Sequence, residues 1–516
     1  MAALCSVSNA AVRLPHVFSD GMVLQREKPV PIWGWAKPGE KVTVKFAGQA
    51  VSSTTSADGR WMLQLKPLST SDKPRELTVT GTDTLVFKDV LVGDVWLCSG
   101  DFGVYYEVFA SANAEAEIAA ANYPTMRLLK VASATSNTPL SDIQGQWMTC
   151  SPTSVSNFSA LAYYFGRALH RELKVPIGVI DCSYRYSYIR SWLAPEGFRM
   201  IPELKESRDR MDSWNSTTDV GQKSFGEAVS RVEQWLPLAD KAFREGTPIP
   251  QQPLMPAPIT GRDEFYQTIG ELSAAYHGMV HPLIPFAIRG VVWSQGENGG
   301  EAETRQAHMR GLIEGWRKQW GQGDFPVYFE LLPRVEAPSA TPCVGGDHWT
   351  MIREGQLKSV SIPNTGAAVT FDVSDYVSDN RNRQDAGQRL ALWALAKEYH
   401  EDIVYSGPTY RSHRIEGDSV TVSFDNIGGG LMAGEKNDLA PTQELKPGVL
   451  RHFAIAGEEK KWQWADARIV GDTVVLRSDK VPTPVAARYA WCPNPQAANL
   501  YNRDGLPAAP FRTDTW

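Results

Sequence analysis

The hydrophobic pattern of the chain changes near residue 90, and this change constrains the fold more than any other feature. Before it, short segments such as 41–46 and 76–80 alternate apolar and polar residues between Gly, Asp and Pro turns, which is typical of strands with one exposed face. After it, a mainly apolar segment at 90–98 is followed by a helical pattern at 160–173. Mainly apolar strands without alternation are typical of parallel sheets with both faces covered by helices. We therefore predict an α/β fold preceded by a small β domain.

The length of the chain, 516 residues, exceeds what one hydrophobic core normally organises, so we expect two or three domains. The predicted division has an N-terminal β domain at 12–90, an α/β domain at 91–405 and a C-terminal β-rich region at 406–516. Inside the α/β domain, a polar helical insertion at about 200–275 ends in a Pro-rich stretch. We predict that this insertion is either a lid over the site or a spacer.

Charge and composition exclude several classes of function. Acidic residues outnumber basic ones, 58 to 52, so nucleic acid is not an expected partner. No apolar run approaches the roughly 20 residues that a membrane helix needs, so no membrane span is predicted. The six Cys residues lack CxxC spacing, which speaks against a zinc or redox site. We expect no metal and no cofactor.

Five segments carry a resemblance to a known family. Residues 90–108 read VLVGDVWLCSGDFGVYYEV, and the segments 14–35, 283–298, 390–399 and 488–516 extend the similarity over nearly the whole chain. Together they resemble the sialate O-acetylesterases. The resemblance implies an SGNH-like (flavodoxin-like) three-layer α/β/α domain with a parallel sheet, flanked by small β-rich domains. It also implies export, so we expect a secreted or periplasmic protein from which a signal peptide has been removed.

The serine that this family uses as its nucleophile is missing. In the family, Cys-Ser-Gly is followed by Gln-Ser-Asn-Met, and the Ser of the second block attacks the ester. The corresponding positions here are Asp101, Phe102, Gly103 and Val104. Because a phenyl ring has no nucleophilic atom, acyl transfer cannot start from position 102.

The other catalytic blocks implied by the resemblance are also altered. Two glycines of the family's oxyanion loop correspond to Arg185 and Tyr186, and a Glu that follows them corresponds to Arg190. Such side chains would fill the space of a tetrahedral intermediate. The family's base His falls on Asp379 or Asn380, and an oxyanion Asn falls on a glycine, at 299. An ordinary serine esterase is therefore excluded by the resemblance.

Either the site has decayed or it has been rebuilt for other chemistry. We favour rebuilding, because the replacements place cations, carboxylates and phenols on loops at the carboxyl ends of parallel strands, where ligands bind in such folds. Arginine binds a sugar carboxylate with two parallel hydrogen bonds, and sialidases use Tyr as nucleophile beside an acid. The predicted function is a sialidase-like glycoside hydrolase that releases sialic acid from sialylated glycans.

The predicted site has two sets of residues. The catalytic candidates are Asp101, Tyr105, Tyr106, Glu107, Glu297 and His348. The substrate-binding candidates are Arg185, Tyr186, Arg190, Gln295, Arg334 and Asp379.

Other interpretations stay open at this point. The protein is alternatively a catalytically inactive homologue that binds sialoglycans, or an esterase with relocated machinery that uses Ser99. Packing beneath a loop is the structural alternative for the two tyrosines, and pairing with surface carboxylates is the alternative for Arg185 and Arg190. For Glu297 the structural alternative is a hydrogen bond to the backbone of the turn at 101–104.

Overall fold

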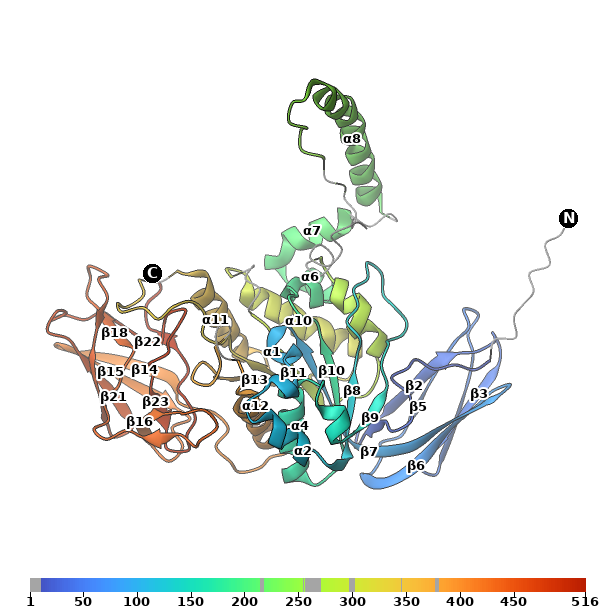
Figure 1. Ribbon diagram of the computed structural model, residues 1–516, viewed down its shortest axis with the longest axis horizontal. Helices are drawn as coiled ribbons and strands as arrows, with labels where there is room; N and C mark the ends of the chain where they lie inside the picture. The colour runs from blue at the N-terminus through green and yellow to red at the C-terminus, as the bar shows by residue number, and fades with distance from the viewer. Residues whose placement is uncertain are drawn as a thin grey trace.

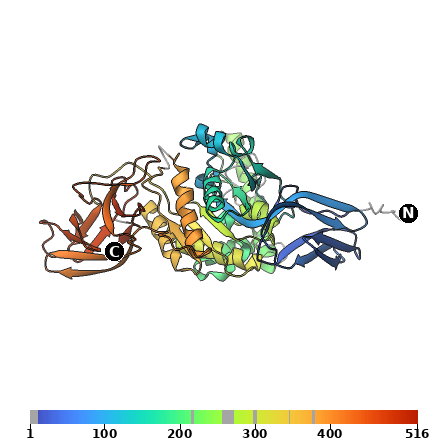
Figure 2. The same cartoon turned by 90° about the horizontal axis from the view of Figure 1, so that it is seen from below.

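Three parts of the molecule follow one another along its long axis. The N-terminal strands lie at one end, an α/β part lies in the middle and the C-terminal strands lie at the other end (Figure 1, Figure 2). The computed structural model describes residues 11–213, 218–253, 255, 271–296, 302–344, 346–375 and 380–516, and of Phe102 it describes the backbone alone.

The middle part is built on a sheet with the strand order β13-β12-β11-β7-β10-β8-β9. Neighbouring strands are parallel from β13 to β8, and β9 pairs antiparallel with β8 at the edge. The strands are β7 (Thr84–Gly100), β8 (Tyr123–Lys130), β9 (Trp147–Cys150), β10 (Ile177–Ser183), β11 (Gly290–Ser294), β12 (Val327–Glu330) and β13 (Thr365–Ala368). The prediction of a mixed α/β fold is confirmed.

Helices cover both faces of this sheet, because its apolar strands point successive side chains to opposite sides. Trp96 and Cys98 of β7 belong to one buried core with α4 and α12, whereas Leu97 belongs to another that includes α10 and α6. The helices of the α/β part are α1 (Phe102–Tyr105), η1 (Val108–Ala110), α2 (Ala114–Ala120), α3 (Pro152–Val155), α4 (Ala160–Leu173), α5 (Ile189–Trp192), α6 (Pro195–Met200), η2 (Pro202–Leu204), η3 (Tyr276–Val280), η4 (His281–Leu283), α10 (Arg305–Trp320), α11 (His348–Lys358), η5 (Ser359–Ser361) and α12 (Arg383–Lys397).

One long strand connects the N-terminal part to the central sheet. The first half of β7 pairs antiparallel with β6, and its second half pairs with β10 and β11 (Figure 1). The N-terminal strands are β1 (Val23–Gln25), β2 (Val30–Trp35), β3 (Lys41–Phe46), β4 (Gln49–Thr54), β5 (Arg60–Leu65) and β6 (Ser71–Thr80). The expected boundary near residue 90 falls inside β7, and the division into domains stays a prediction.

A buried carboxylate joins these two parts at the amino end of the central sheet. The side chain of Asp94 in β7 is fully buried and lies 2.9 Å from the guanidinium of Arg26 and 2.7 Å from that of Arg289. Gln25 donates a further hydrogen bond of 2.9 Å to the same carboxylate. Burial alone would raise the pKa of Asp94, but the hydrogen bond from Arg26 and the charge of Arg289 outweigh it and hold this pKa below its ordinary value.

The C-terminal part consists of small antiparallel sheets. The guanidinium of Arg353 in α11 is buried and donates to the carbonyl groups of Leu332 and Cys492 at 3.0 and 2.8 Å, which ties this part to the α/β part. Its strands are β14 (Thr409–Glu416), β15 (Ser419–Asp425), β16 (Leu431–Glu435), β17 (Gln443–Glu444), β18 (Phe453–Ala456), β19 (Gln463–Trp464), β20 (Asp466–Val470), β21 (Thr473–Arg477), β22 (Ala486–Tyr489), β23 (Leu500–Asn502) and β24 (Phe511–Arg512).

The insertion contains α7 (Lys205–Ser213) and α8 (Asp219–Glu245), and α8 stands away from the central sheet (Figure 1). The hydroxyl of Thr218 caps α8 by accepting the Gly221 N–H at 3.1 Å, and Gly246 ends the helix with a φ of 66°. Whether the insertion is a lid or a spacer stays a prediction. None of the helices in the described ranges has the length and apolar character needed to cross a membrane.

Candidate functional site

The position of the family's nucleophile lies at the carboxyl edge of the central sheet. Strand β7 ends at Gly100, and α1 begins two residues later at Phe102. Gly100 has a φ of 131°, and a Cβ atom there would overlap the carbonyl oxygen of Ser294. Only glycine fits this turn.

Beneath this turn, a second glycine leaves room for a buried polar cluster. A Cβ atom at Gly103 would overlap the hydroxyl of Ser294 and lie 3.0 Å from Glu330 Oε2. The hydroxyl of Ser294 donates to the same carboxylate oxygen at 2.7 Å. The family's Asn at position 103 would therefore collide with this arrangement, so the replacement at 103 and the Ser294–Glu330 pair depend on each other.

The cluster continues into α12 through an ion pair. Arg383 Nη1 lies 3.0 Å from Glu330 Oε2, and both side chains are almost completely buried. Arg383 also donates to the hydroxyl of Ser374, and the Ser374 carbonyl accepts the backbone N–H of Arg334 at 3.4 Å. These contacts join the carboxyl ends of β11 and β12 to the start of α12.

Several buried polar atoms of this region have no hydrogen-bond partner among the residues that the structure describes. They are Glu330 Oε1, Arg383 Nε, Arg334 Nε and both amide atoms of Asn380. Leaving such an atom unsatisfied costs about 1–3 kcal/mol. Their concentration at one edge of the sheet indicates a place where a polar ligand or water completes the hydrogen bonding. We refer to Ser294, Glu330, Arg334, Asn380 and Arg383 as the edge cluster.

Asp101, predicted as a catalytic acid, holds the backbone of the next loop. Its side chain is buried and accepts the backbone N–H of Tyr186. Tyr186 has a φ of 65°, which is unusual for a bulky residue, and the guanidinium of Arg185 lies 4.6 Å from the centre of its ring. Asp101, Arg185 and Tyr186 thus lie together beside the turn at position 102.

Tyr105 is the last residue of α1, and Tyr106 and Glu107 follow it directly. The hydroxyl of Tyr106 donates to the carbonyl of Ala110 at 2.9 Å, and Glu107 forms an ion pair with Lys130. The ammonium of Lys130 also lies 5.9 Å from the centre of the Tyr105 ring. The described contacts therefore engage Glu107 with a cation and the Tyr106 phenol with a carbonyl, and they do not pair a phenol with a carboxylate.

Of the remaining candidates, Gln295 follows Ser294 of the edge cluster directly. The described side-chain contacts of Arg190 and His348 are instead to aromatic rings. Gln295 is buried between Ser187, at 3.2 Å from its amide nitrogen, and Arg305, at 2.7 Å from its amide oxygen. The guanidinium of Arg190 lies 4.5 Å from the centre of the Tyr188 ring. His348 is exposed at the start of α11 and packs edge-on against its neighbour Trp349.

The described contacts do not join His348 to Asp101 or to the edge cluster. Glu297 and Asp379 lie outside the described residues. The catalytic and binding roles of all these candidates stay predictions.

Ser99, the alternative nucleophile, is fully buried and donates to the carbonyl of Cys182 at 2.7 Å. This contact makes Ser99 part of the packing between β7 and β10. No group of three or more His, Cys, Asp or Glu side chains in the described ranges is arranged to hold a metal ion.

Asp181 in β10 is a buried carboxylate that the sequence alone did not single out. Burial raises its pKa to about 6, although a hydrogen bond from Ser183 and the charge of Lys130 act in the opposite direction. A shift of this kind makes Asp181 a further candidate.

Glu330 and Arg383 were also missed, although the sequence held a signal for both. Glu330 interrupts an apolar run at 327–332, and a charged residue in a buried strand requires a partner. Arg383 lies in the retained block that starts at Asn382. Their pairing is decided by contacts across 53 residues of sequence.

Comparison with known proteins bears on what this edge does. No family model matches the chain. The sialate O-acetylesterase of Mus musculus is 27% identical over 547 residues, which cover 97% of this chain and 94% of the relative. That of Homo sapiens is 26% identical over 543 residues, covering 97% and 92%. The crystal structure of a carbohydrate acetylesterase from Xanthomonas citri matches with a TM-score of 0.79 and 30% identity, covering 98% of this chain and all of that chain.

These findings correct the predicted activity. The relatives are named for cleaving an ester, so the prediction of a sialidase-like glycoside hydrolase is wrong. Esterases are hydrolases, and that broader class is the one the relatives support. Because the similarity extends over nearly the whole chain, the protein belongs to the sialate O-acetylesterase family, with the serine and histidine of its catalytic motifs replaced.

Proposed function

We propose that this protein binds O-acetylated carbohydrate at the carboxyl edge of its central sheet and that serine-dependent cleavage of the acetyl ester has been lost. An O-acetylated sialic acid is the ligand that the names of the mammalian relatives suggest. The observation that carries the proposal is the edge cluster, because it combines buried unsatisfied polar atoms with Phe102 at the nucleophile position.

The chemistry of the edge cluster suits the uncharged, O-acetylated part of a sugar. The charges of Glu330 and Arg383 compensate each other at 3.0 Å, whereas Glu330 Oε1 and the Asn380 amide offer two acceptors and a donor. Sugar hydroxyls and an acetyl carbonyl complement such groups. Without a nucleophile at position 102, the ester would be bound rather than attacked.

A second candidate keeps the hydrolase activity of the relatives but moves the nucleophile to Ser294. The hydrogen bond from its hydroxyl to Glu330 is the contact that a serine and a carboxylate base make. Ser294 is buried beneath α1, so this route requires α1 to move.

Two finer expectations also stand as proposals. The helices on both faces of the parallel strands support an SGNH-like three-layer arrangement of the α/β part. An extracytoplasmic location is proposed from the family resemblance, and mass spectrometry of fractionated cells of the source would test it.

The test combines turnover, labelling and binding. Purified protein is incubated with 4-nitrophenyl acetate and with O-acetylated sialic acid, and with a fluorophosphonate whose attachment is mapped by mass spectrometry. We expect neither turnover nor labelled serine, together with tighter binding of O-acetylated oligosaccharides than of their deacetylated counterparts. A label on Ser294 accompanied by turnover would replace the proposal with the second candidate, and equal binding of both oligosaccharide forms would refute it.

A further inference from the structure

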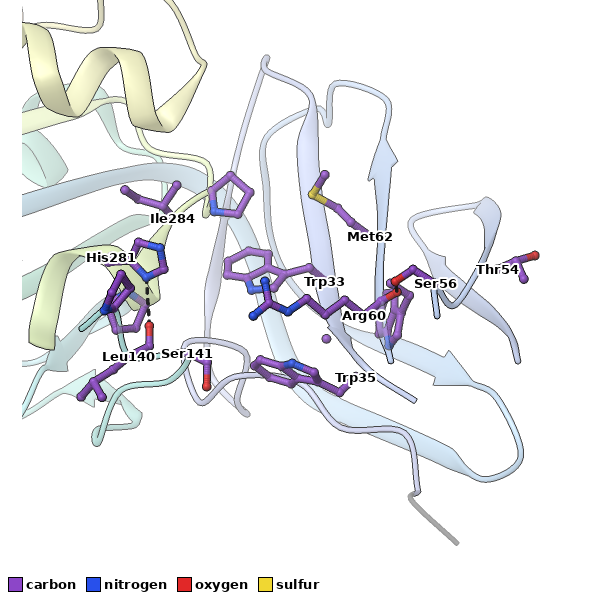
Figure 3. Close-up of a pocket in the computed structure, with 15 residues that line it drawn as sticks. Trp33, Trp35, Thr54, Ser56, Arg60, Met62, Leu140, Ser141, His281 and Ile284 are labelled. Carbon is purple, nitrogen blue, oxygen red and sulfur yellow. Dashed lines mark hydrogen bonds between the residues drawn. The ribbon is translucent and has the colours of Figure 1, made fainter. Parts of the chain in front are cut away.

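A wide groove separates the N-terminal strands from the α/β part, away from the edge cluster. It has a volume of about 780 Å³ (Figure 3). One wall is formed by β2 and β5, and the other by residues 139–141 and by the chain around η4. Its lining includes Trp33, Trp35, Arg60, Met62, Ser141 and His281.

The sheet wall presents an apolar face to this groove. Trp33 and Trp35 are two residues apart in β2 and therefore point to the same side of the strand. In the antiparallel pairing with β5, Trp33 lies opposite Met62 and Trp35 lies opposite Arg60. The two tryptophans are half-buried and Met62 is 58% exposed. The solvent-facing side of an antiparallel strand is normally polar, so this apolar face indicates a binding surface.

Polar groups surround the two indole rings. Figure 3 shows the guanidinium of Arg60 beside Trp33 and Trp35, with Ser141 and His281 across the groove. Arg60 lies 3.7 Å from Asp58, which offsets its charge. The ring of His281 uses Nδ1 for a contact of 2.9 Å to the carbonyl of Leu140, so the neutral ring has Nε2 as an acceptor.

We propose that this groove is a second carbohydrate-binding site, which takes an uncharged stretch of an oligosaccharide whose acetylated unit occupies the edge cluster. The C–H face of a sugar ring packs on Trp33 and Trp35, and its hydroxyls bind Arg60, Ser141 and His281. The indole faces can stack on an uncharged sugar ring without a counter-charge from the ligand. The combination of aromatic faces with donors and acceptors at the rim distinguishes this ligand from a purely apolar partner. The link to the edge cluster rests on the function proposed above, whereas the groove itself does not.

One loop connects the two places. The hydroxyl of Ser133 donates to the carbonyl of Ser183, at the carboxyl end of β10, at 3.4 Å. Seven residues later, Leu140 lines the groove. Since an extended chain spans at most about 3.6 Å per residue, Ser133 and Leu140 are no more than roughly 25 Å apart. Ser183 lies two strands, or about 10 Å, from Ser294 of the edge cluster, because both pair with Gly100 of β7. An oligosaccharide of several units is long enough to span this combined separation.

The experiment measures binding to an array of neutral, O-acetylated and sialylated oligosaccharides, followed by calorimetric titration with the strongest binder. Trp35→Ala and Arg60→Ala are expected to weaken binding at least about tenfold, because they remove a stacking surface and a hydroxyl donor. Arg60 is well exposed, so its replacement keeps the fold even if Trp35→Ala does not. Trp235→Ala on α8 is the matched control, because this tryptophan is also half-buried but its indole contacts the carbonyl of Pro250.

The outcomes separate this inference from the proposed function. Weaker binding in both groove variants, with Trp235→Ala unchanged, supports the second site. If Glu330→Gln weakens binding while Arg60→Ala and a folded Trp35→Ala leave it unchanged, the groove is not a carbohydrate site and the proposed function stands. If only the groove variants weaken binding, the proposed function fails and the groove remains. An array without any bound oligosaccharide overturns both.

Discussion

The two ends of the central sheet both contain a buried carboxylate paired with arginine, but they differ in how completely it is satisfied. At the amino end, Asp94 is held by Arg26, Arg289 and Gln25 through both carboxylate oxygens. At the carboxyl end, Glu330 uses only Oε2 for Ser294 and Arg383, and Oε1 has no partner within the described part of the chain.

This difference indicates that the amino end of the sheet contributes to stability and the carboxyl end to the proposed binding. A buried charge is tolerated when its hydrogen bonds are complete, as they are around Asp94, and such a network holds the parts of the molecule together. Incomplete hydrogen bonding around Glu330 leaves an acceptor that a further polar molecule can satisfy, which is the basis of the proposed function. In the α/β part, the buried carboxylate at the amino end therefore has partners on both oxygens, whereas the one at the carboxyl end has partners on one oxygen only.

The largest expected effect is the loss of stability when an ion pair of Asp94 at the amino end is broken. Arg289→Ala removes a cation 2.7 Å from buried Asp94 and should lower the free energy of unfolding by about 3–5 kcal/mol. Urea unfolding followed by circular dichroism measures this loss. Arg310→Ala is the control, because its pair with Glu314 is exposed and should contribute less than about 0.5 kcal/mol. Equal losses in the two variants would show that the Asp94 network does not join the parts.

A pH-dependent effect of intermediate size is expected from Asp181. Because its pKa is raised from 3.8 to about 6, the folded state binds a proton more tightly than the unfolded state does. The free energy of unfolding should therefore fall as the pH rises from about 4 to about 6. Above pH 6 the ionised, buried Asp181 lowers it by about 3 kcal/mol at most. Asp181→Asn should remove this loss, stabilising the protein at pH 7 but not at pH 4. The free energy of unfolding of the wild type and of Asp181→Asn, measured at four pH values, checks this prediction. A stabilisation by Asp181→Asn that is as large at pH 4 as at pH 7 would contradict it.

An effect on both stability and binding is expected at the carboxyl end. In Glu330→Gln the amide oxygen still accepts from Ser294 and Arg383, but the buried Arg383 guanidinium loses its counter-charge, so the loss of stability should be about 3 kcal/mol. Affinity for O-acetylated oligosaccharide should fall about tenfold, since a buried acceptor is replaced by a donor. Calorimetry measures the affinity, and Asp58→Asn, on the exposed surface, is the control. Unchanged affinity would remove Glu330 from the binding site.

The smallest expected effect is that of restoring the family's serine. Phe102→Ser should leave the rate of 4-nitrophenyl acetate hydrolysis at the wild-type level, because the members of a catalytic triad act as a unit and the base position holds Asp379 or Asn380. A double variant that also carries Asp379→His tests whether the base is the missing part. If Phe102→Ser alone produced turnover, the remaining residues would already form an esterase site.

The elements that the sequence determined are those with strong local patterns. The helix predicted at 160–173 and the strand predicted at 41–46 are confirmed with the same bounds, because hydrophobic periodicity and flanking polar residues are local properties. The sequence also indicates a helix at 310–320, and the structure begins this helix five residues earlier, at Arg305. Motif comparison also identified the family and the loss of its serine and histidine.

Only the tertiary structure decided which charged side chains meet. Gly103, Ser294, Glu330 and Arg383 come from four separate segments, and their contact depends on the order in which β7, β11 and β12 pair. The contacts of two catalytic candidates were likewise not evident from the sequence, because the fold directs the Tyr106 hydroxyl to a carbonyl and Glu107 to Lys130. Periodicity determines which face of an element is buried, but it does not specify which distant side chain completes a buried charge, because that depends on packing among elements.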